Sequence, residues 1–479
     1  MNPTINNKAT TAVISIAISA LTIFLFATAL NQPFIGDDYW WLFNAEYVMS
    51  NPGGWIDAFF QMNGSGFYRP ITQNVFFFLM YHAFGFHALW YHITAIFFYL
   101  ATGFILYKTL LLLYRDYYSA TVGASVYLFS SINYSSISWV SAFSQTGSSL
   151  FFVSTLYLYI LGGRYKKYSY ISFVLCLLSS EITSTLPAFL LLYELLIKNS
   201  AVLRSFINTI LFWLLLFFYI ILRFMVIGIH PAGPFGMVQN LHTLIKIFGD
   251  SLLWISGFTP TFVNATHEKG WDVISIFSYL TFLTAYAVAF FKLFTERNVH
   301  VHYKFISVGL LWIVVGMTPV LIFSLNDYNK YTLAISLVGF SLITAGIIGG
   351  IKHKSKKIIS SVIVLSSFFV NLCAIYNPDG NNNVQGLNVF GAISHKFSNE
   401  LYSCGIINHK IKRIYVVNGD RIKWIIGYQW EAKVVLQSPS VKTILVKYSN
   451  NYGKRSPVFF YKNNKIKVIS CGVIVNSGE

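Results

Sequence analysis

The chain has 479 residues, of which 55% are hydrophobic and only 11% are charged. Soluble globular domains carry about 25% charged residues, so this composition excludes an ordinary soluble enzyme and excludes a disordered chain even more firmly. The net charge of +17 would suggest a nucleic-acid partner for a soluble protein, but here it must first be divided between the two sides of a membrane. We therefore expect membrane lipids, and no nucleic acid, as partners.

Long apolar runs recur along the chain, and a membrane-spanning helix needs about 20 mostly apolar residues. Eleven runs are predicted to form such helices, and the two between residues 168 and 198 are the shortest. They cover residues 10–30, 88–111, 118–134, 144–162, 168–182, 183–198, 205–225, 272–291, 305–324, 331–350 and 358–375. The predicted fold class is a polytopic α-helical membrane protein with about eleven transmembrane helices, which form one domain over residues 1–375.

The distribution of Lys and Arg indicates the orientation, because these residues concentrate in short cytoplasmic loops. With the N-terminus inside, the inner segments hold fifteen Lys and Arg, whereas the outer segments before residue 376 hold five. The five outer residues are Arg69, Arg223, Lys246, Lys269 and Lys330. Acidic residues gather instead on the outer side or at the outer ends of helices, which the same rule does not require. We therefore expect a functional site on the outer face.

The first outer loop, residues 31–87, contains the sequence Gly36-Asp37-Asp38-Tyr39. Either Asp37 caps a helix and Asp38 is a first-turn acid, or one of the two is a catalytic carboxylate. Two adjacent carboxylates repel each other, so one of them is expected to have a raised pKa, which suits a general base. Residues 72–84 are apolar but too few to span a membrane, and they are predicted to form a helix along its outer surface.

Arg69, in the sequence Phe67-Tyr68-Arg69-Pro70, is the only Lys or Arg in this loop. One interpretation is a salt bridge to an acidic residue of the same loop. The other is a phosphate clamp, for which the planar guanidinium is suited.

Three other ionisable residues lie at the outer ends of predicted helices. Glu181 is a functional candidate if it lies within the membrane, where a charge is costly, and needs no explanation if it lies at the interface. Lys330 would bind phosphate or pair with Asp327, and Arg223 borders a second large outer loop, residues 226–271.

Histidines 82, 87 and 92 are spaced five residues apart, which suits neither a helix face nor strand alternation. Because a shared face is needed to bring such ligands onto one ion, no metal site is predicted.

Residues 376–479 differ in composition from the rest of the chain. An Asn-rich turn leads into β-type runs at 414–417, 432–435, 443–446 and 467–470, which predict a small β-rich domain outside the membrane. This region holds fourteen Lys and Arg against five Asp and Glu. Its basic surface either only solubilises the domain or faces anionic lipid headgroups or a phosphorylated glycan. Cys404 and Cys471 either form a disulfide there or are two free thiols.

Four stretches, in this order, resemble motifs of membrane glycosyltransferases of the GT-C fold, in particular relatives of the protein O-mannosyltransferases and of bacterial transferases that use lipid-linked sugars. They are Gly36-Asp37-Asp38-Tyr39; Tyr68-Arg69-Pro70-Ile71 followed by Phe84-Gly85 and His92; Ser180-Glu181-Ile182 through Leu186-Pro187 and Tyr193-Glu194; and Asn329-Lys330-Tyr331-Thr332-Leu333. Together they span most of residues 30–340.

The resemblance implies a polyprenyl-phosphate-linked sugar donor, a glycan or lipid-linked glycan acceptor outside, and an inverting single displacement. It maps the general base to Asp37, with Asp38 as the alternative. It maps the cations that stabilise the leaving phosphate to Arg69 and Lys330. Further substrate contacts are expected from Tyr68, His92, Glu181 and Arg223. The second outer loop offers Ser144-Gln145-Thr146 where the family often has an acid, so neither a metal nor a cofactor is predicted.

The size of the chain, its first outer loop and its C-terminal region also resemble the serotype-converting O-antigen glucosyltransferases of enteric bacteria and their phages. That likeness implies glucose as the sugar, O-antigen lipopolysaccharide as the acceptor, and an active site on the periplasmic face of the bacterial inner membrane. A flippase and a transferase that makes the donor would be partners.

Two other functions stay open. One is an O-antigen polymerase or ligase, although such proteins rely mainly on outer-loop arginines. The other is a transporter or flippase of lipid-linked glycans, for which repeated halves would be expected, and the sequence shows no internal repeat.

Overall fold

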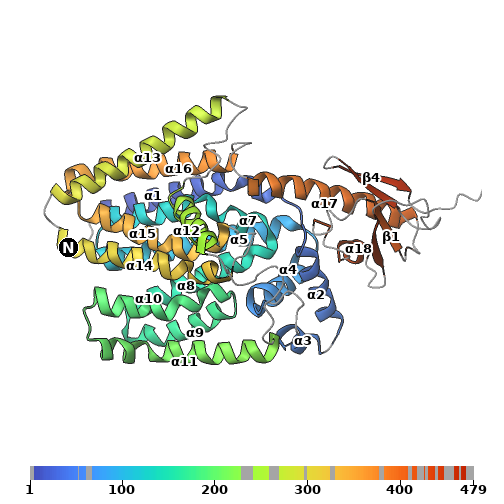
Figure 1. The fold of residues 1–479 in the computed structure, drawn as a ribbon, viewed down its shortest axis with the longest axis horizontal. Helices are drawn as coiled ribbons and strands as arrows, with labels where there is room; N and C mark the ends of the chain where they lie inside the picture. Colours follow the sequence, from blue (N-terminus) through green and yellow to red (C-terminus); the bar gives the residue numbers. More distant parts are fainter. Residues whose placement is uncertain are drawn as a thin grey trace, which may run out of the picture.

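The computed structural model describes residues 5–51, 53–60, 67–227, 241–257, 269–295, 299–323, 330–376, 382–407, 411, 413–417, 425–426, 430–436, 441–446, 458–462 and 465–470. They form a bundle of long helices, with the first-loop helices and a smaller α/β region at one end of it (Figure 1).

A helix lies at each of the eleven predicted apolar segments. The bundle helices are α1 (Ile5–Leu25), α5 (Ala88–Tyr114), α6 (Tyr117–Phe129), α8 (Phe143–Leu161), α9 (Lys166–Leu177), α10 (Leu186–Leu192) continued by the π-helix η7 (Tyr193–Ile197), α11 (Val202–Ile227), α13 (Lys269–Thr295), α14 (Val299–Phe323), α15 (Ala334–Gly349) and α16 (His353–Tyr376). Short 3-10 helices connect several of them: η1 (Ala27–Asn31), η3 (Ser131–Asn133), η4 (Val140–Ala142), η5 (Gly163–Tyr165), η6 (Glu181–Thr185) and η9 (Lys330–Leu333).

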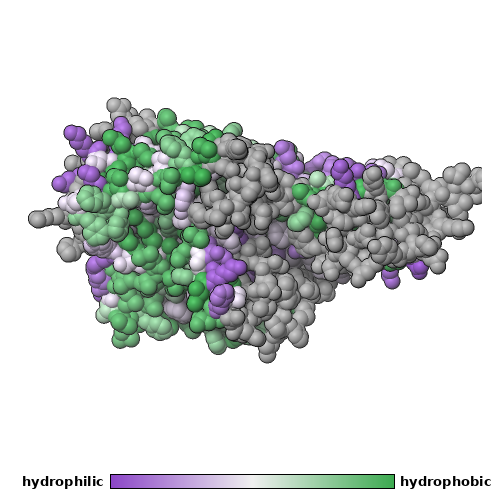
Figure 2. Space-filling view, turned by 45° about the horizontal axis from the view of Figure 1, so that its top comes forward, coloured by the Kyte–Doolittle hydropathy of each residue, from purple (hydrophilic) through white to green (hydrophobic). Residues whose placement is uncertain are grey.

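Five of the described helices are long and apolar enough to cross a membrane, namely those within Ala88–Tyr114, Val202–Ile227, Val273–Thr295, Lys330–Gly349 and Lys354–Tyr376. On α11 the side chains of Phe217 and Phe218 are 57% and 62% exposed. A monomeric soluble protein rarely exposes large contiguous apolar patches, whereas lipid tails solvate them. Figure 2 shows hydrophobic side chains over the bundle in this view, and hydrophilic ones at the end away from the C-terminal region. The protein is therefore a helical membrane protein, and the number of about eleven spans stays a prediction.

The centre of the bundle is α15, which packs against α14 and α6. Small residues allow the closest approach: a Cβ added at Gly339 of α15 would lie 2.7 Å from the carbonyl oxygen of Gly309 in α14. Small residues at such crossings are typical of membrane helix pairs, because they let two backbones come close enough for extensive van der Waals contact.

The first outer loop folds into α2 (Asp38–Ser50), α3 (Gly54–Phe60), the π-helix η2 (Pro70–Val75) and α4 (Phe76–Phe84). The prediction that residues 72–84 are helical is confirmed, and their place on the membrane surface stays a prediction. These helices lie at the end of the bundle nearest the C-terminal region (Figure 1). The short helix α7 (Tyr134–Ser138) contacts α8, and α12 (Leu241–Ile255) lies within the predicted second outer loop, most of which is outside the described residues.

The C-terminal region contains α17 (Asn382–Ile407), β1 (Arg413–Val417), α18 (Trp430–Val435), β2 (Lys442–Val446), β3 (Val458–Lys462) and β4 (Lys465–Ser470). The sheet has the order β2-β1-β3-β4, in which β1 is parallel to both neighbours and β3 and β4 are antiparallel. It has a hydrophobic core of its own, which includes Phe397, Ile414, Val416 and Phe459.

One predicted strand in this region is wrong, and one long helix is missing from the prediction. The 26-residue helix α17 was not predicted, although Ile393, Phe397, Leu401 and Cys404 recur at helical spacing and are buried in the core. Residues 432–435 belong to α18 and not to a strand. The alternation of residues 432–435 is compatible with a strand, but β-propensity depends strongly on context. Here the segment packs as the helix α18 against α2.

Cys404 is disulfide-bonded, whereas Cys176 and Cys373 are free and buried. Cys471 lies outside the described residues.

Candidate functional site

Asp38 is buried at the start of α2 and joins two segments that are distant in the sequence. Its Oδ1 accepts hydrogen bonds from the Ser141 N–H, at 2.6 Å, and from the Ser141 hydroxyl, and its Oδ2 accepts one from the Ile35 N–H at 3.0 Å. Burial raises the pKa of Asp38 to about 7, although the hydrogen bonds favour the ionised form. The predicted raised pKa is thus found at Asp38, with burial as its main cause and repulsion by Asp37 as a lesser one.

Asp37 is half-buried at the N-cap position of α2 and forms no side-chain hydrogen bond to the helix N-terminus. A capping side chain needs an extended backbone, but Asp37 has helical angles, with φ −66° and ψ −15°. The capping interpretation of Asp37 is therefore wrong. Asp38 secures this turn instead, because it reaches back to the Ile35 N–H.

Arg69 forms a salt bridge, but its partner is not an acid of the same loop. Its Nε donates to Glu181 Oε2 at 2.8 Å, and one terminal nitrogen donates to the Ser144 hydroxyl at 3.2 Å. The guanidinium also lies over the Phe67 ring, 4.1 Å from its centroid. Glu181 therefore holds the Arg69 guanidinium in one orientation.

Residues 141–144 connect the acidic and the cationic parts of this site. Ser141, in η4, binds Asp38, and Ser144, in the first turn of α8, binds Arg69. Neither serine is among the residues predicted for the site. The signal in the sequence is a stretch from Ser141 to Ser149 that is rich in polar residues, within an otherwise apolar part of the chain.

Tyr68 and Arg223 lie on the Glu181 side of the site. The Tyr68 N–H donates to Glu181 Oε1 at 2.9 Å, and the Tyr68 ring centroid is 6.3 Å from that of Tyr219 in α11. Arg223, one turn beyond Tyr219, interacts electrostatically with the Tyr219 hydroxyl, as do Arg69 and Glu181. The structure thus gathers four of the predicted residues around Tyr219: Tyr68, Arg69, Glu181 and Arg223.

Two predicted residues have other surroundings. His92 is fully buried, with Nδ1 2.7 Å from the Ile137 carbonyl oxygen and Nε2 2.9 Å from that of Gln32, so both ring nitrogens face the backbone. Lys330, at the start of η9, places its Nζ 5.1 Å from the centroid of the Trp254 ring in α12. Among the described contacts none joins Lys330 to Arg69, and Asp327 lies outside the described residues.

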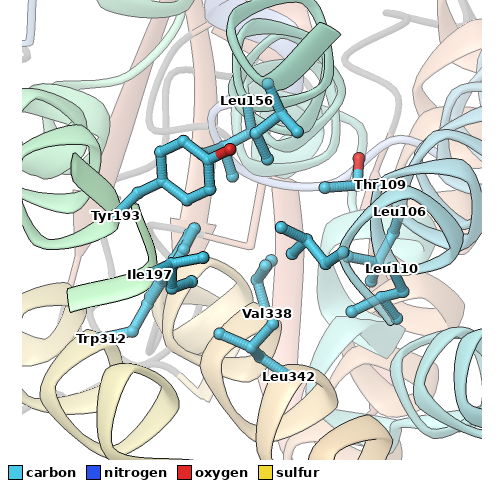
Figure 3. A pocket seen from close by; sticks show the side chains of 11 residues that line it. Leu106, Thr109, Leu110, Leu156, Tyr193, Ile197, Trp312, Val338 and Leu342 are labelled. Carbon is cyan, nitrogen blue, oxygen red and sulfur yellow. The ribbon is translucent and has the colours of Figure 1, made fainter. Parts of the chain in front are cut away.

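A small apolar cavity, of about 20 Å³, lies toward the end of the bundle away from Asp38. Figure 3 shows side chains from α5, α8, η7, α14 and α15 around it, among them Leu106, Leu156, Tyr193, Trp312 and Leu342. It is too small for a sugar. Within the part of the chain that the structure describes, no group of three His, Cys, Asp or Glu could hold a metal ion.

No model of a known protein family matches the chain, and a comparison with curated proteins gives no match.

Proposed function

We propose that the protein is an inverting glycosyltransferase that moves a hexose, with glucose as the first to test, from a polyprenyl-phosphate donor to an O-antigen-type glycan. In this proposal about eleven helices span the bacterial inner membrane. The first outer loop and residues 376–479 lie in the periplasm, and a flippase and a donor-synthesising transferase supply the donor.

The reaction requires one base and one cationic group on opposite sides of the sugar. The acceptor hydroxyl attacks the anomeric carbon and gives its proton to the base, while the bond from that carbon to the phosphate oxygen breaks. The polyprenyl phosphate then leaves with an added negative charge, which a cation stabilises.

The proposal depends on one observation: the segment 141–144 binds both parts of the site. Ser141 hydrogen-bonds to Asp38 in the acidic turn, and Ser144 hydrogen-bonds to Arg69. We assign the base to Asp37 because its half-buried side chain is more accessible than Asp38, whose two oxygens accept three hydrogen bonds in a fully buried position. Asp38 is assigned as the residue that positions this turn.

Arg69 is assigned to the donor phosphate. Its described hydrogen bonds use Nε and Nη1, and no bond to Nη2 occurs within the described residues. The pair with Glu181 reduces its charge but holds the planar group in one orientation, which is the property that favours Arg over Lys as a phosphate ligand. Lys330 stays a candidate for a second phosphate contact.

The test uses the full-length protein in liposomes, with polyprenyl-phosphate-linked radioactive glucose and lipopolysaccharide from cells that lack the protein. We expect Asp37→Asn to lower transfer by about 10²–10⁴-fold, because general-base assistance is worth that much. We expect its thermal stability to change little, because Asn has nearly the same shape as Asp. Near-normal transfer by Asp37→Asn would move the base to Asp38, and near-normal transfer by both single Asn variants would exclude this motif as the catalytic centre.

A second measurement addresses the donor. We expect Arg69→Ala to raise the KM for the donor and lower kcat without changing the acceptor that is used. Lys246→Ala is the matched control, because Lys246 is an exposed basic residue of α12 on the same predicted face. Equal turnover and donor affinity in both variants would reduce Arg69 to a structural partner of Glu181. Unchanged glycan composition in cells without the protein would contradict the proposed function as a whole.

A further inference from the structure

A buried cluster of polar side chains joins the first outer loop to the C-terminal region. The Tyr39 hydroxyl, from α2, lies 3.0 Å from the Ser394 hydroxyl and 3.2 Å from that of Ser398, both from α17. Glu431 Oε1, from α18, lies 2.6 Å from the Ser398 hydroxyl and 3.3 Å from that of Ser394. The Ser394 hydroxyl also lies 2.9 Å from the Phe34 carbonyl oxygen. Tyr39 directly follows Asp38, so the cluster begins beside the proposed catalytic turn.

The protons in this cluster can be counted. Five oxygen–oxygen contacts link Tyr39, Ser394, Ser398, Glu431 and the Phe34 carbonyl. Each hydrogen bond needs one proton, and the three hydroxyl groups supply three. With a protonated Glu431, four of the five contacts can be hydrogen bonds at the same time, whereas with an ionised Glu431 only three can. The uncharged acid therefore satisfies more of the cluster.

The surroundings of Glu431 also favour the uncharged acid. Its side chain has no solvent exposure, and no hydrogen-bond partner for Oε2 occurs within the described residues. An unpaired buried carboxylate is costly, and the group protonates instead. Burial raises the pKa of Glu431 well above its usual range, although hydrogen bonds from Ser398, Ser394 and Tyr39 act in the opposite direction.

The C-terminal region contacts this turn at further points on both sides of it. Before the turn, the Gly36 N–H donates to the Ile425 carbonyl oxygen at 3.0 Å. After it, Val434 is buried in a cluster with Trp41 and Leu42, and Lys433 Nζ lies 5.4 Å from the centroid of the Phe43 ring. Glu431 is a carboxylic acid buried within this interface.

We infer that Glu431 is a positioning residue for the proposed transferase, and that its uncharged carboxyl group fixes Tyr39 and with it the N-terminal turn of α2, which carries Asp37 and Asp38. The inference rests on the proposed function, because only that function gives the turn held by Glu431 a part in catalysis. A displacement of about 1 Å at a catalytic group can lower a rate by about 10²-fold, so a residue that contacts no substrate can still control turnover.

The experiment compares Glu431→Gln, Glu431→Ala and Tyr39→Phe in the full-length protein. The first measurement is hydrogen–deuterium exchange of the peptide that covers residues 35–50. The second is kcat and KM with polyprenyl-phosphate-linked glucose. Tyr99→Phe is the matched control, because it removes a buried tyrosine hydroxyl that donates to the Tyr127 carbonyl oxygen and takes no part in the cluster.

We expect Glu431→Ala and Tyr39→Phe to speed exchange in residues 35–50 by about 5- to 100-fold, the range that lost buried hydrogen bonds produce. They should lower kcat by about 10- to 100-fold and leave the KM for the donor unchanged, because Arg69 is not part of the cluster. Glu431→Gln should stay near the wild type in both measurements, because the amide is uncharged and has nearly the same shape. The Tyr99→Phe control should not change exchange in residues 35–50.

Normal exchange in Glu431→Ala would overturn the inference, and so would faster exchange with an unchanged kcat. A Glu431→Gln variant that behaves like Glu431→Ala would overturn the assignment of an uncharged acid. If the wild-type protein transfers no sugar, the proposed function fails, and with it the assigned role. The exchange data would then still show whether Glu431 holds the turn.

Discussion

Asp37 and Asp38 are neighbours in the chain, but the fold gives them different environments. Asp38 points into the protein, where three donors from Ile35 and Ser141 surround its carboxyl group. Asp37 stays half-buried beside it, without a bond to the helix end. One acid can therefore position the turn while the other remains accessible, and the two roles separate in experiments on single variants.

The pH dependence of stability tests the environment of Asp38. The pKa of Asp38 is about 7 in the folded protein and about 3.9 in an unfolded chain, so between these values only the folded state holds the proton. The stabilisation is complete below pH ~4 and is lost as the pH rises through ~7, with a slope of at most about 1.4 kcal/mol per pH unit.

We expect Asp38→Asn to lack this slope. We also expect it to be less stable by about 1–3 kcal/mol, because its amide N–H₂ would face a backbone donor. Thermal unfolding in detergent between pH 4 and pH 8 measures both effects. Subtracting the pH dependence of the variant from that of the wild type removes the contribution of Glu431, because both proteins contain this residue. The same pH dependence in both proteins would contradict the burial of an ionisable Asp38.

At the scale of whole elements, close helix contacts position the site. Ser144 lies in the first turn of α8, and Glu181 begins η6, which leads into α10. The orientation of Arg69 therefore depends on how these elements pack. The bundle beneath them is centred on α15, most of whose side chains are buried. Its contact with α14 brings backbone next to backbone at Gly309 and Gly339.

This close contact predicts that position 339 does not tolerate a residue larger than glycine. A methyl group at Gly339 would lie 2.7 Å from the Gly309 carbonyl oxygen and 3.0 Å from the Ile313 backbone nitrogen, and backbone atoms cannot rotate away. We expect Gly339→Ala to destabilise the protein by about 1–3 kcal/mol, the usual cost of overpacking. Gly249→Ala in α12 is the control, because nothing lies within 4 Å of its added Cβ. Equal unfolding temperatures for the two variants would contradict the close α14–α15 contact.

At the scale of the whole molecule, the C-terminal region and the first outer loop lie on the same side of the bundle, because α18 packs against α2 (Figure 1). The ten predicted spans between residues 87 and 376 agree with this placement, since an even number of crossings returns the chain to the same side.

Reporter fusions test this arrangement. A reporter that is active only in the periplasm should be active when fused after Glu479 and inactive when fused after Arg164, in the predicted inner connection η5. A reporter that is active only in the cytoplasm should give the reverse pattern. Cytoplasmic activity after Glu479 would contradict the predicted orientation, and opposite results for fusions after Gly53 and Glu479 would contradict the contact between the two regions.

The amino-acid sequence determined the class of this protein and the positions of most helices, because hydropathy and its periodicity are local properties. Long apolar runs can form helices without reference to the rest of the chain, and β1, β2 and β4 were recognisable from β-type runs of the same local kind. Composition likewise identified residues such as Asp38, Arg69 and Glu181 as candidates, since charges are few in such a chain.

Only the tertiary structure decided which of these charges are buried and what they contact. Glu181 pairs with Arg69 across 112 positions, and Ser141 binds Asp38 across 103 positions. Glu431 is an ordinary acid in a basic tail until α17, α18 and α2 enclose it. Burial and pairing depend on which distant segments meet, and local hydropathy does not contain this information, so the helices could be predicted and the contacts of the site could not.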